Sequence, residues 1–185
     1  NKIHNKLDLI IKETNKEINL VGDSTLLNPW DRHINDSLQL TRFISNKNAK
    51  IIDLGTGAGI PGLPLSICGY DNLTMVDSKY KKINFIKNFI SKHKIQCKII
   101  CKRVEKIKNI SFDYIICRAF APLVDILNYS LLFQKKDTTI LLLKGRSVTS
   151  EIEHSKKCYE FDYNLFDSSS VGGGFVLEIN KLKKL

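Results

Sequence analysis

A short apolar segment that leads straight into a cluster of glycines constrains the fold more than any other feature of this sequence. Residues 50–54 read Lys-Ile-Ile-Asp-Leu, which has the length and the β-branched character of a buried strand. Gly55, Gly57, Gly59 and Gly62 follow directly. Glycines let the backbone turn with a positive φ and let a ligand come close to it. The segment therefore predicts a strand that turns sharply into a helix at a ligand-binding loop.

Strands and helices alternate downstream of this loop. Apolar segments predict further strands at 73–77, 97–101, 112–117 and 138–143. Helical patterns between them begin at Pro64 or cover 79–93, 122–133 and 150–157, and Ser78 is the expected N-cap of the helix over 79–93. Such alternation is typical of a parallel sheet with helices on both faces. The last two predicted strands, 159–166 and 175–179, have no helix between them, so we expect them to pair antiparallel.

Two amphipathic helices are expected ahead of the sheet, over 2–19 and 30–43. In the first, Ile3, Leu7 and Ile10 repeat at helical spacing and predict one apolar face. The predicted fold is therefore α/β, with a doubly wound, mostly parallel seven-stranded sheet. Two N-terminal helices precede the sheet, and an antiparallel C-terminal hairpin ends it.

Composition excludes several classes of protein. Of the 185 residues, 43% are hydrophobic and 26% are charged, as in a globular domain and unlike a disordered or fibrous chain. No apolar run approaches the ~20 residues of a membrane span, and no signal sequence opens the chain. The five cysteines form no C-x-x-C pair and no metal-ligand pattern with histidine, which indicates reduced thiols. We expect a monomeric, cytoplasmic protein that binds neither a membrane nor a metal.

Positive charge is concentrated in one segment. Residues 79–108 hold eleven lysines and arginines and a single acid, Glu105, so this segment accounts for the whole formal net charge of +10. A localised positive field attracts polyanions, chiefly nucleic acid. A lysine-rich composition without any partner is the other interpretation, and the sequence leaves both open.

Two cofactors compete for the glycine loop. Residues 57–62 match the dinucleotide pattern G-x-G-x-x-G, and Asp77 ends the next strand, where a carboxylate can accept ribose hydroxyls. Pro61 inside the turn, Asp53 before it and the lack of a second domain are evidence against a dinucleotide. S-adenosylmethionine carries an ammonium and a sulfonium but no phosphate, so it suits an acid at that place better. The loop therefore favours S-adenosylmethionine.

Several motifs, taken together and in order, resemble one known family. They are Asp53–Gly62, Asp77-Ser78, Arg103-Val104-Glu105, Cys117-Arg118-Ala119-Phe120 and Leu143-Lys144-Gly145, with Asn19-Leu20 and residues 32–38 as an N-terminal signature. The chain thereby resembles the ribosomal small-subunit methyltransferase G family, also called glucose-inhibited division protein B. The resemblance implies a Rossmann-like class I methyltransferase in a single domain over 1–185. A helical extension is expected over 1–45 and a cofactor-binding sheet core over 46–185.

The resemblance also implies an activity and a partner. It implies that S-adenosylmethionine is used to methylate N7 of one guanine in 16S ribosomal RNA, near the decoding centre. The RNA is expected within the small ribosomal subunit or a precursor of it. Carried over onto this sequence, the resemblance implies cofactor contacts at Gly55, Ile60, Val104, Glu105 and Arg118. The argument from the loop and the strand end adds Gly57, Gly59 and Asp77.

Methylation of guanine N7 requires no proton removal, because N7 already has an exposed lone pair. The enzyme need only orient the reactants, which can lower a barrier by ~7–11 kcal/mol, so no general base is expected. Five basic residues that can reach the carboxyl edge of the sheet are the expected substrate-positioning groups: Arg118, Arg32, His33, Lys144 and Arg146.

Two other residues near the end of the fourth strand leave alternatives open. Phe120 either stacks on a flipped base or packs in the core. Cys117 is expected to be a buried thiol, although a cytosine-C5 methyltransferase would need a cysteine nucleophile near this point. The alternatives to the leading function are a methyltransferase for another RNA base, a tRNA or a protein, a nucleic-acid-binding module with a vestigial cofactor site, and a small NAD-binding domain.

Overall fold

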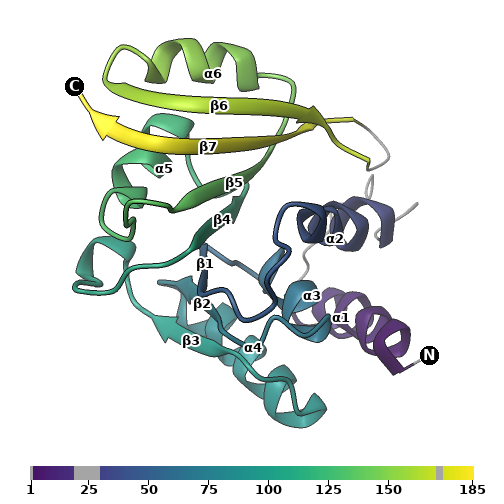
Figure 1. Ribbon diagram of the computed structural model, residues 1–185. Coiled ribbons are helices and arrows are strands. Elements are labelled where there is room, and N and C mark those ends of the chain that lie inside the picture. Colours follow the sequence, from purple (N-terminus) through teal and green to yellow (C-terminus); the bar gives the residue numbers. More distant parts are fainter. Residues whose placement is uncertain (1, 19–29, 170–172) are drawn as a thin grey trace.

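The computed structural model describes residues 2–18, 30–169 and 173–185, and its centre is a seven-stranded sheet (Figure 1). In chain order the strands are β1 (Ile51–Leu54), β2 (Leu73–Asp77), β3 (Lys98–Cys101), β4 (Tyr114–Arg118), β5 (Thr139–Lys144), β6 (Tyr159–Asp167) and β7 (Phe175–Lys184). Their spatial order is β3-β2-β1-β4-β5-β7-β6. The strands β1 to β5 pair in parallel, and β7 pairs antiparallel with both β5 and β6. The predicted α/β fold with an antiparallel C-terminal hairpin is confirmed.

The helices lie on both faces of this sheet. In chain order they are α1 (Lys2–Ile18), α2 (Asp36–Leu38) between the turns η2 (Trp30–Asn35) and η3 (Gln39–Arg42), α3 (Gly62–Ile67), α4 (Tyr80–His93), the turn η4 (Val104–Lys106), α5 (Leu123–Ser130) and α6 (Val148–Ser155). In Figure 1, α1, α2 and α3 lie to the right of the sheet and α5 lies to its left. The fold is thus doubly wound, as the alternation of strands and helices predicts.

Two apolar clusters form the core, one on each face of the sheet. On β1, Ile51 faces the cluster that contains Leu7 and Ile10 of α1, whereas Ile52 and Leu54 face the cluster under α5 and α6. Successive side chains of a strand point to opposite faces, so a central strand buried on both sides is apolar except where a polar side chain has buried partners, as Asp53 of β1 has. All four residues of β1 are buried, and this explains why the segment shows no polar alternation.

Three local predictions are wrong. The segment 30–43 is not one α-helix, because a π-helical turn, a single α-turn and a 3₁₀ turn follow one another there. Ile3 is 46% exposed, although Leu7 and Ile10 on the same helix are buried as expected. Ser78 does not cap α4, because the cap position is Lys79, whose backbone N–H donates to Asp77 Oδ1 at 2.8 Å. The Asp77 carboxylate thus bonds to the cap residue itself, and no side chain caps the first turn of α4. The division of the chain at residue 45 stays a prediction.

Candidate functional site

A cleft opens at the carboxyl edge of the sheet, next to the glycine loop. Its cavity has a volume of about 150 Å³. We call this cavity the edge pocket, and its walls come from Gly55, Asp77, Ser78, Lys102, Arg103, Val104, Glu105, Phe120 and Tyr129. These residues follow β1, β2, β3 and β4 or lie on α5, so four adjacent strand ends build the site. Ligands bind at this edge in open α/β sheets.

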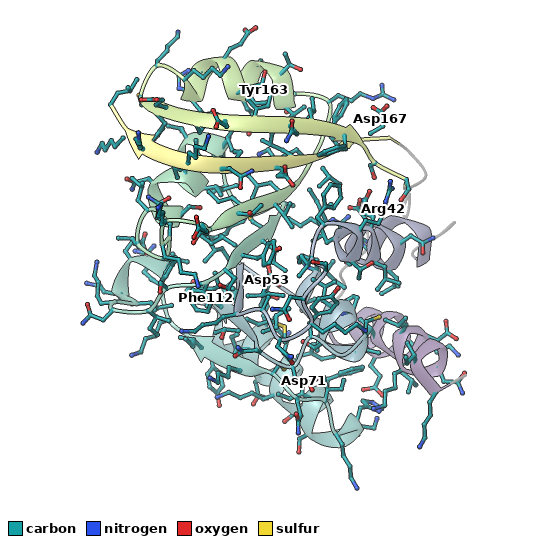
Figure 2. The ribbon with its side chains drawn as sticks, in the orientation of Figure 1. Arg42, Asp53, Asp71, Phe112, Tyr163 and Asp167 are labelled. Atoms are coloured by element: carbon teal, nitrogen blue, oxygen red, sulfur yellow. The ribbon has the colours of Figure 1, made fainter. Side chains whose placement is uncertain are left out.

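Asp53 anchors the glycine loop from beneath. It is fully buried in the middle of the molecule (Figure 2), and its Oδ2 accepts bonds from the Thr56 hydroxyl at 2.5 Å and from the Gly62 backbone N–H at 3.0 Å. A Cβ on Gly62 would lie 2.7 Å from that oxygen, so only glycine lets the loop close onto the carboxylate. Burial raises the pKa of Asp53 to about 7. The acid at this place therefore shapes the loop from inside and is not part of the pocket wall.

Three glycines of the loop have a positive φ, and each serves a different purpose. At Gly55 (φ +66°) a Cβ would lie 2.0 Å from the Phe120 ring, so the absence of a side chain lets that ring cover the end of β1. At Gly57 (φ +60°) a Cβ would extend into open space and meet only the Lys82 ammonium at 3.8 Å and the Gly55 carbonyl oxygen at 3.9 Å. At Gly59 (φ +91°) it would overlap Leu63 at 2.4 Å, which is a packing constraint.

Asp77 connects the loop to the next strand. Its Oδ2 accepts a bond from the Gly57 backbone N–H at 3.0 Å, and its Oδ1 accepts one from the Lys79 N–H at 2.8 Å. A carboxylate has about four acceptor positions, so each oxygen can accept a further bond from a ligand. The carboxylate is thus held in a fixed orientation at the wall of the edge pocket.

Aromatic and acidic side chains form the opposite wall. The Phe120 and Tyr129 rings lie 5.7 Å apart between centroids, and the Tyr129 hydroxyl donates to Glu105 Oε1 at 3.3 Å. The bond from its own backbone N–H, together with the Tyr129 hydroxyl, lowers the pKa of the exposed Glu105. Burial, followed by the neighbouring Glu105, raises the pKa of Tyr129. At neutral pH this wall therefore presents a carboxylate and a protonated phenol beside a flat apolar surface.

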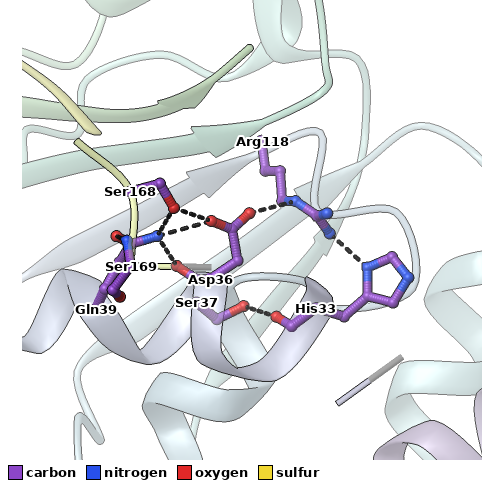
Figure 3. Close-up of polar contacts among 7 residues, drawn as sticks. All are labelled: His33, Asp36, Ser37, Gln39, Arg118, Ser168 and Ser169. Carbon is purple, nitrogen blue, oxygen red and sulfur yellow. Dashed lines mark hydrogen bonds and ion pairs between the residues drawn. The ribbon is translucent and has the colours of Figure 1, made fainter. Parts of the chain in front are cut away.

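Arg118, at the end of β4, belongs to a different set of contacts (Figure 3). Its Nε lies 3.1 Å from Asp36 Oδ2, and its Nη1 lies 2.7 Å from His33 Nδ1. Arginine can only donate, so the His33 nitrogen that faces it is the unprotonated one. Asp36 Oδ1 also accepts bonds from Gln39 Nε2 at 2.7 Å and from the Ser168 hydroxyl at 3.2 Å. Arg118 thus joins α2, the end of β4 and the residues that follow β6.

Lys144, at the end of β5, is likewise paired. Its ammonium lies 2.6 Å from Glu151 Oε2, and the same oxygen accepts the Leu123 backbone N–H at the start of α5. Burial raises the pKa of Glu151, but the bonds from Lys144 and Leu123 outweigh it, so the pKa is lowered overall. Arg146 is exposed, and the side chain of Arg32 lies outside the described part of the chain.

Cys117 is a buried thiol, as expected. It is 1% exposed, and burial, followed by the charge of Asp53, raises its pKa far above the ordinary range. Thiolate is the nucleophilic form of cysteine, so this residue is not activated for attack on a base. The structure thus provides no cysteine nucleophile at the end of β4.

The edge pocket brings together four of the eight residues expected to contact a cofactor: Gly55, Asp77, Val104 and Glu105. The other four, Gly57, Gly59, Ile60 and Arg118, are outside its walls, although Gly57 bonds to Asp77. Sequence reasoning missed Tyr129, which lies on α5 far along the chain and has no motif around it. It also missed Lys102 and Ser78, which could have been found as residues that directly follow strands β3 and β2.

The residues present fit S-adenosylmethionine. Gly57 leaves open the space that a Cβ would fill, and Asp77 can accept ribose hydroxyls with both of its oxygens already oriented. Phe120 and the buried Val104 offer apolar surface for an adenine ring. Within the described residues, no group of acids, histidines and cysteines could hold a metal ion, and no helix is long and apolar enough to cross a membrane.

Comparison with other sequences gives a consistent result. Residues 2–172 match the model of a family described as rRNA small subunit methyltransferase G (GidB). A curated protein named ribosomal RNA small subunit methyltransferase G, from Rickettsia prowazekii (strain Madrid E), is 43% identical over 178 residues, which are 95% of this chain and 91% of the relative.

Solved structures share the architecture at low sequence identity. The ribosomal protein L11 methylase of Lactobacillus delbrueckii subsp. bulgaricus superposes with a TM-score of 0.63 at 15% identity, over 78% of this chain and 76% of that one. The magnesium protoporphyrin IX methyltransferase of Synechocystis PCC 6803, solved with SAM bound, also gives 0.63 at 12% identity, over 82% and 79%. These likenesses show a Rossmann-like class I methyltransferase fold.

Proposed function

Because the chain belongs to the rRNA small subunit methyltransferase G family, we propose that it transfers the methyl group of S-adenosylmethionine to N7 of a guanine in 16S ribosomal RNA. One observation carries this proposal: the residues that the resemblance assigns to the cofactor after two separate strands, Gly55 after β1 and Val104 and Glu105 after β3, meet in one pocket with Asp77, which ends a third strand. Convergence of distant motifs on one cavity is what a cofactor site requires.

Different residues of the chain bind different parts of the cofactor. Gly57 leaves space beside the backbone for the ligand, Asp77 holds ribose hydroxyls, and Val104 and Phe120 cover the base. When bound, S-adenosylmethionine supplies a methyl group that its sulfonium makes electrophilic. The protein orients the reactants and excludes water from them, and this alone can supply ~7–11 kcal/mol of barrier lowering.

Two titratable groups of the pocket, Glu105 and Tyr129, are consistent with N7 as the acceptor atom. Glu105 has a lowered pKa, so it is a weak base, and Tyr129 has a raised pKa, so it stays protonated. Neither group is suited to remove a proton at neutral pH. Guanine N7 needs no such removal, whereas an exocyclic amine loses a proton when it is methylated. The inert Cys117 argues in the same way against a cytosine-C5 reaction.

The remaining parts of the proposal concern the form of the RNA substrate, the oligomeric state and the location of the enzyme. We propose that the RNA is met within the small ribosomal subunit or a precursor particle, that the enzyme acts as a monomer, and that it works in the cytoplasm. Arg118, His33, Lys144, Arg146 and Arg32 stay proposed as substrate-positioning residues. The first three are held by contacts within the protein, so any role with RNA requires them to exchange those partners.

A methyl-transfer assay tests the activity. Small subunits from cells that lack this modification are incubated with the protein and labelled S-adenosylmethionine, and the RNA is digested to nucleosides. We expect label in 7-methylguanosine alone. Label in another nucleoside would instead indicate a methyltransferase for another RNA base. Absence of transfer by a protein that still binds S-adenosylhomocysteine would instead favour a binding module. The same assay on naked 16S RNA separates particle from free RNA as the substrate.

A further inference from the structure

The basic segment 79–108 differs from the rest of the chain in its density of positive charge, with eleven lysines and arginines against one acid. Among the described residues, four cations elsewhere are ion-paired within the protein: Arg118, Lys135, Lys144 and Lys181. Within the segment, Lys92 is the one lysine or arginine that has an ion pair with another described residue. The other ten cations have none, and nine of them are exposed. Like charges gathered without partners destabilise the compact state through repulsion, so a use outside the fold is expected for them.

These cations do not form one patch, because the sheet register divides them. Asp77 of β2 pairs with Cys101 of β3, so the residues that follow the two strands emerge side by side at the carboxyl edge. Lys102 and Arg103 line the edge pocket there, and the Lys82 ammonium lies near the site of a Gly57 Cβ. We call six residues around this opening the rim cations: Lys79, Lys81, Lys82, Lys102, Arg103 and Lys106.

Of the four other unpaired cations, Lys108 follows η4, and the remaining three lie away from the pocket. Helix α4 has 14 residues, and at 1.5 Å per residue its far end is about 20 Å from its first turn. Lys87 lies midway along α4, and Lys94 caps its far end. Lys98 opens β3 at the opposite end of that strand from the pocket. These three residues are the distal cations.

The far end of α4 also has a use within the fold. Glu13 of α1 lies 2.7 Å from the Lys92 ammonium and 3.1 Å from His93 Nε2, and the Lys6 ammonium donates to the His93 carbonyl at 2.8 Å. Helix α1 is therefore docked on this end of α4. The basic segment thus has one end that meets its own chain and one end that is open at the pocket.

We propose that the rim cations bind the backbone phosphates of the RNA strand whose target base is presented to the edge pocket, and that the distal cations do not. The proposal rests on the proposed function for the identity of the polyanion. Phosphates next to a target base must pass close to the cofactor, and the rim is where unpaired cations surround that opening. The strand then crosses the ends of β2 and β3.

Two triple variants with the same loss of charge test this surface. The rim triple replaces Lys79, Lys81 and Lys106 with Gln, and the distal triple replaces Lys87, Lys94 and Lys98 with Gln. The probe is a 16S RNA transcript, and its dissociation constant is measured over a series of salt concentrations. For single-stranded RNA each phosphate contact contributes about 0.7 to the slope of log K against log salt. We expect the rim triple to lose up to about two slope units and the distal triple to keep the wild-type slope.

Controls separate this proposal from failures of folding and of the proposed function. Lys79 meets Asp77 through its backbone N–H, which Gln retains, so S-adenosylhomocysteine affinity should be unchanged in both variants. A rim triple to Arg keeps the charge and should keep the wild-type slope, even if the Gln variant folds poorly. Equal slopes in the rim and distal triples, or an unchanged slope in the rim triple, overturn the proposal. If the rim triple loses salt slope but the wild-type protein transfers no methyl group, the RNA-binding surface is supported and the proposed function is refuted.

Discussion

The two halves of the carboxyl edge of the sheet differ in whether their cations are ion-paired. At the ends of β1, β2 and β3, Asp77 lines an open pocket, and the cations around it have no ion pair within the described residues. At the ends of β4 and β5, Arg118 is paired with Asp36, and Lys144 is paired with Glu151. Both halves have the residue types of a polyanion site. Pairing separates the half that is open to a ligand from the half that holds the protein together.

The hydrogen bonds of Asp36 show what the second half holds together. Through Arg118, Gln39 and Ser168 this carboxylate connects α2 at one end of the chain, β4 in its middle and the hairpin of β6 and β7 at its other end. Backbone hydrogen bonds of the sheet do not join these segments to α2, so side-chain contacts must do so. We expect removal of such a contact to lower stability, and removal of a rim cation to change only binding.

The largest effect is expected in the glycine loop of the open half. In Gly55→Val the new side chain would overlap Phe120, and in Gly57→Val it would extend into the open space beside Asp77 at a φ that disfavours it. We expect S-adenosylhomocysteine affinity to fall at least a hundredfold in each, as measured by isothermal titration calorimetry. Gly145→Ala is the control, because a Cβ there meets nothing within 4 Å. Near-normal affinity in a folded Gly57→Val protein would refute the assignment of the loop.

That prediction needs little beyond the sequence, because a strand that ends in glycines already indicates the loop. The paired half could not be predicted in this way. Arg118 was expected to bind the cofactor because a motif contains it, but its orientation depends on Asp36, which lies 82 positions earlier. The insertion of β7 between β5 and β6 is also invisible in the sequence, since the order of strands within a sheet depends on long-range packing. Local pattern predicts elements, whereas tertiary contacts decide which charges are free.

The second-largest effect is a dependence of the free energy of unfolding on pH, through Asp53, which anchors the glycine loop. Burial raises the pKa of Asp53 to about 7 from 3.8, so between these values the native state binds a proton that the unfolded chain has lost. The free energy of unfolding must then fall as pH rises through this window, by at most about 1.4 kcal/mol per pH unit. We expect this slope to disappear in Asp53→Asn, as measured by urea unfolding from pH 4 to pH 8. A slope of the same size in both proteins would show that Asp53 is not its source.

The third effect tests the paired half directly. Asp36→Asn keeps the shape of the side chain but removes the charge that Arg118 faces at a site where both side chains are mostly buried. We expect the free energy of unfolding to fall by about 1–3 kcal/mol, with S-adenosylhomocysteine affinity unchanged. Lys79→Gln is the matched change in the open half, and it should alter stability by no more than about 0.5 kcal/mol. A drop in cofactor affinity in Asp36→Asn would instead support the contact between Arg118 and the cofactor that the resemblance implies.

The smallest effect on catalysis is expected at Cys117, a buried residue next to the end of β4. Its thiol is buried, its pKa is raised by burial, and transfer to N7 forms no covalent bond to the enzyme. Cys117→Ala should therefore retain methyl-transfer activity within about twofold and lose about 1 kcal/mol of stability through the small cavity that it leaves. Activity is compared at a temperature where both proteins are folded, and Cys158→Ala, at an exposed position, is the control. Complete loss of activity in a folded Cys117→Ala protein would give this strand end a chemical role. The end of β4 would then take part in the reaction, and the contrast with the open half of the sheet edge would no longer hold.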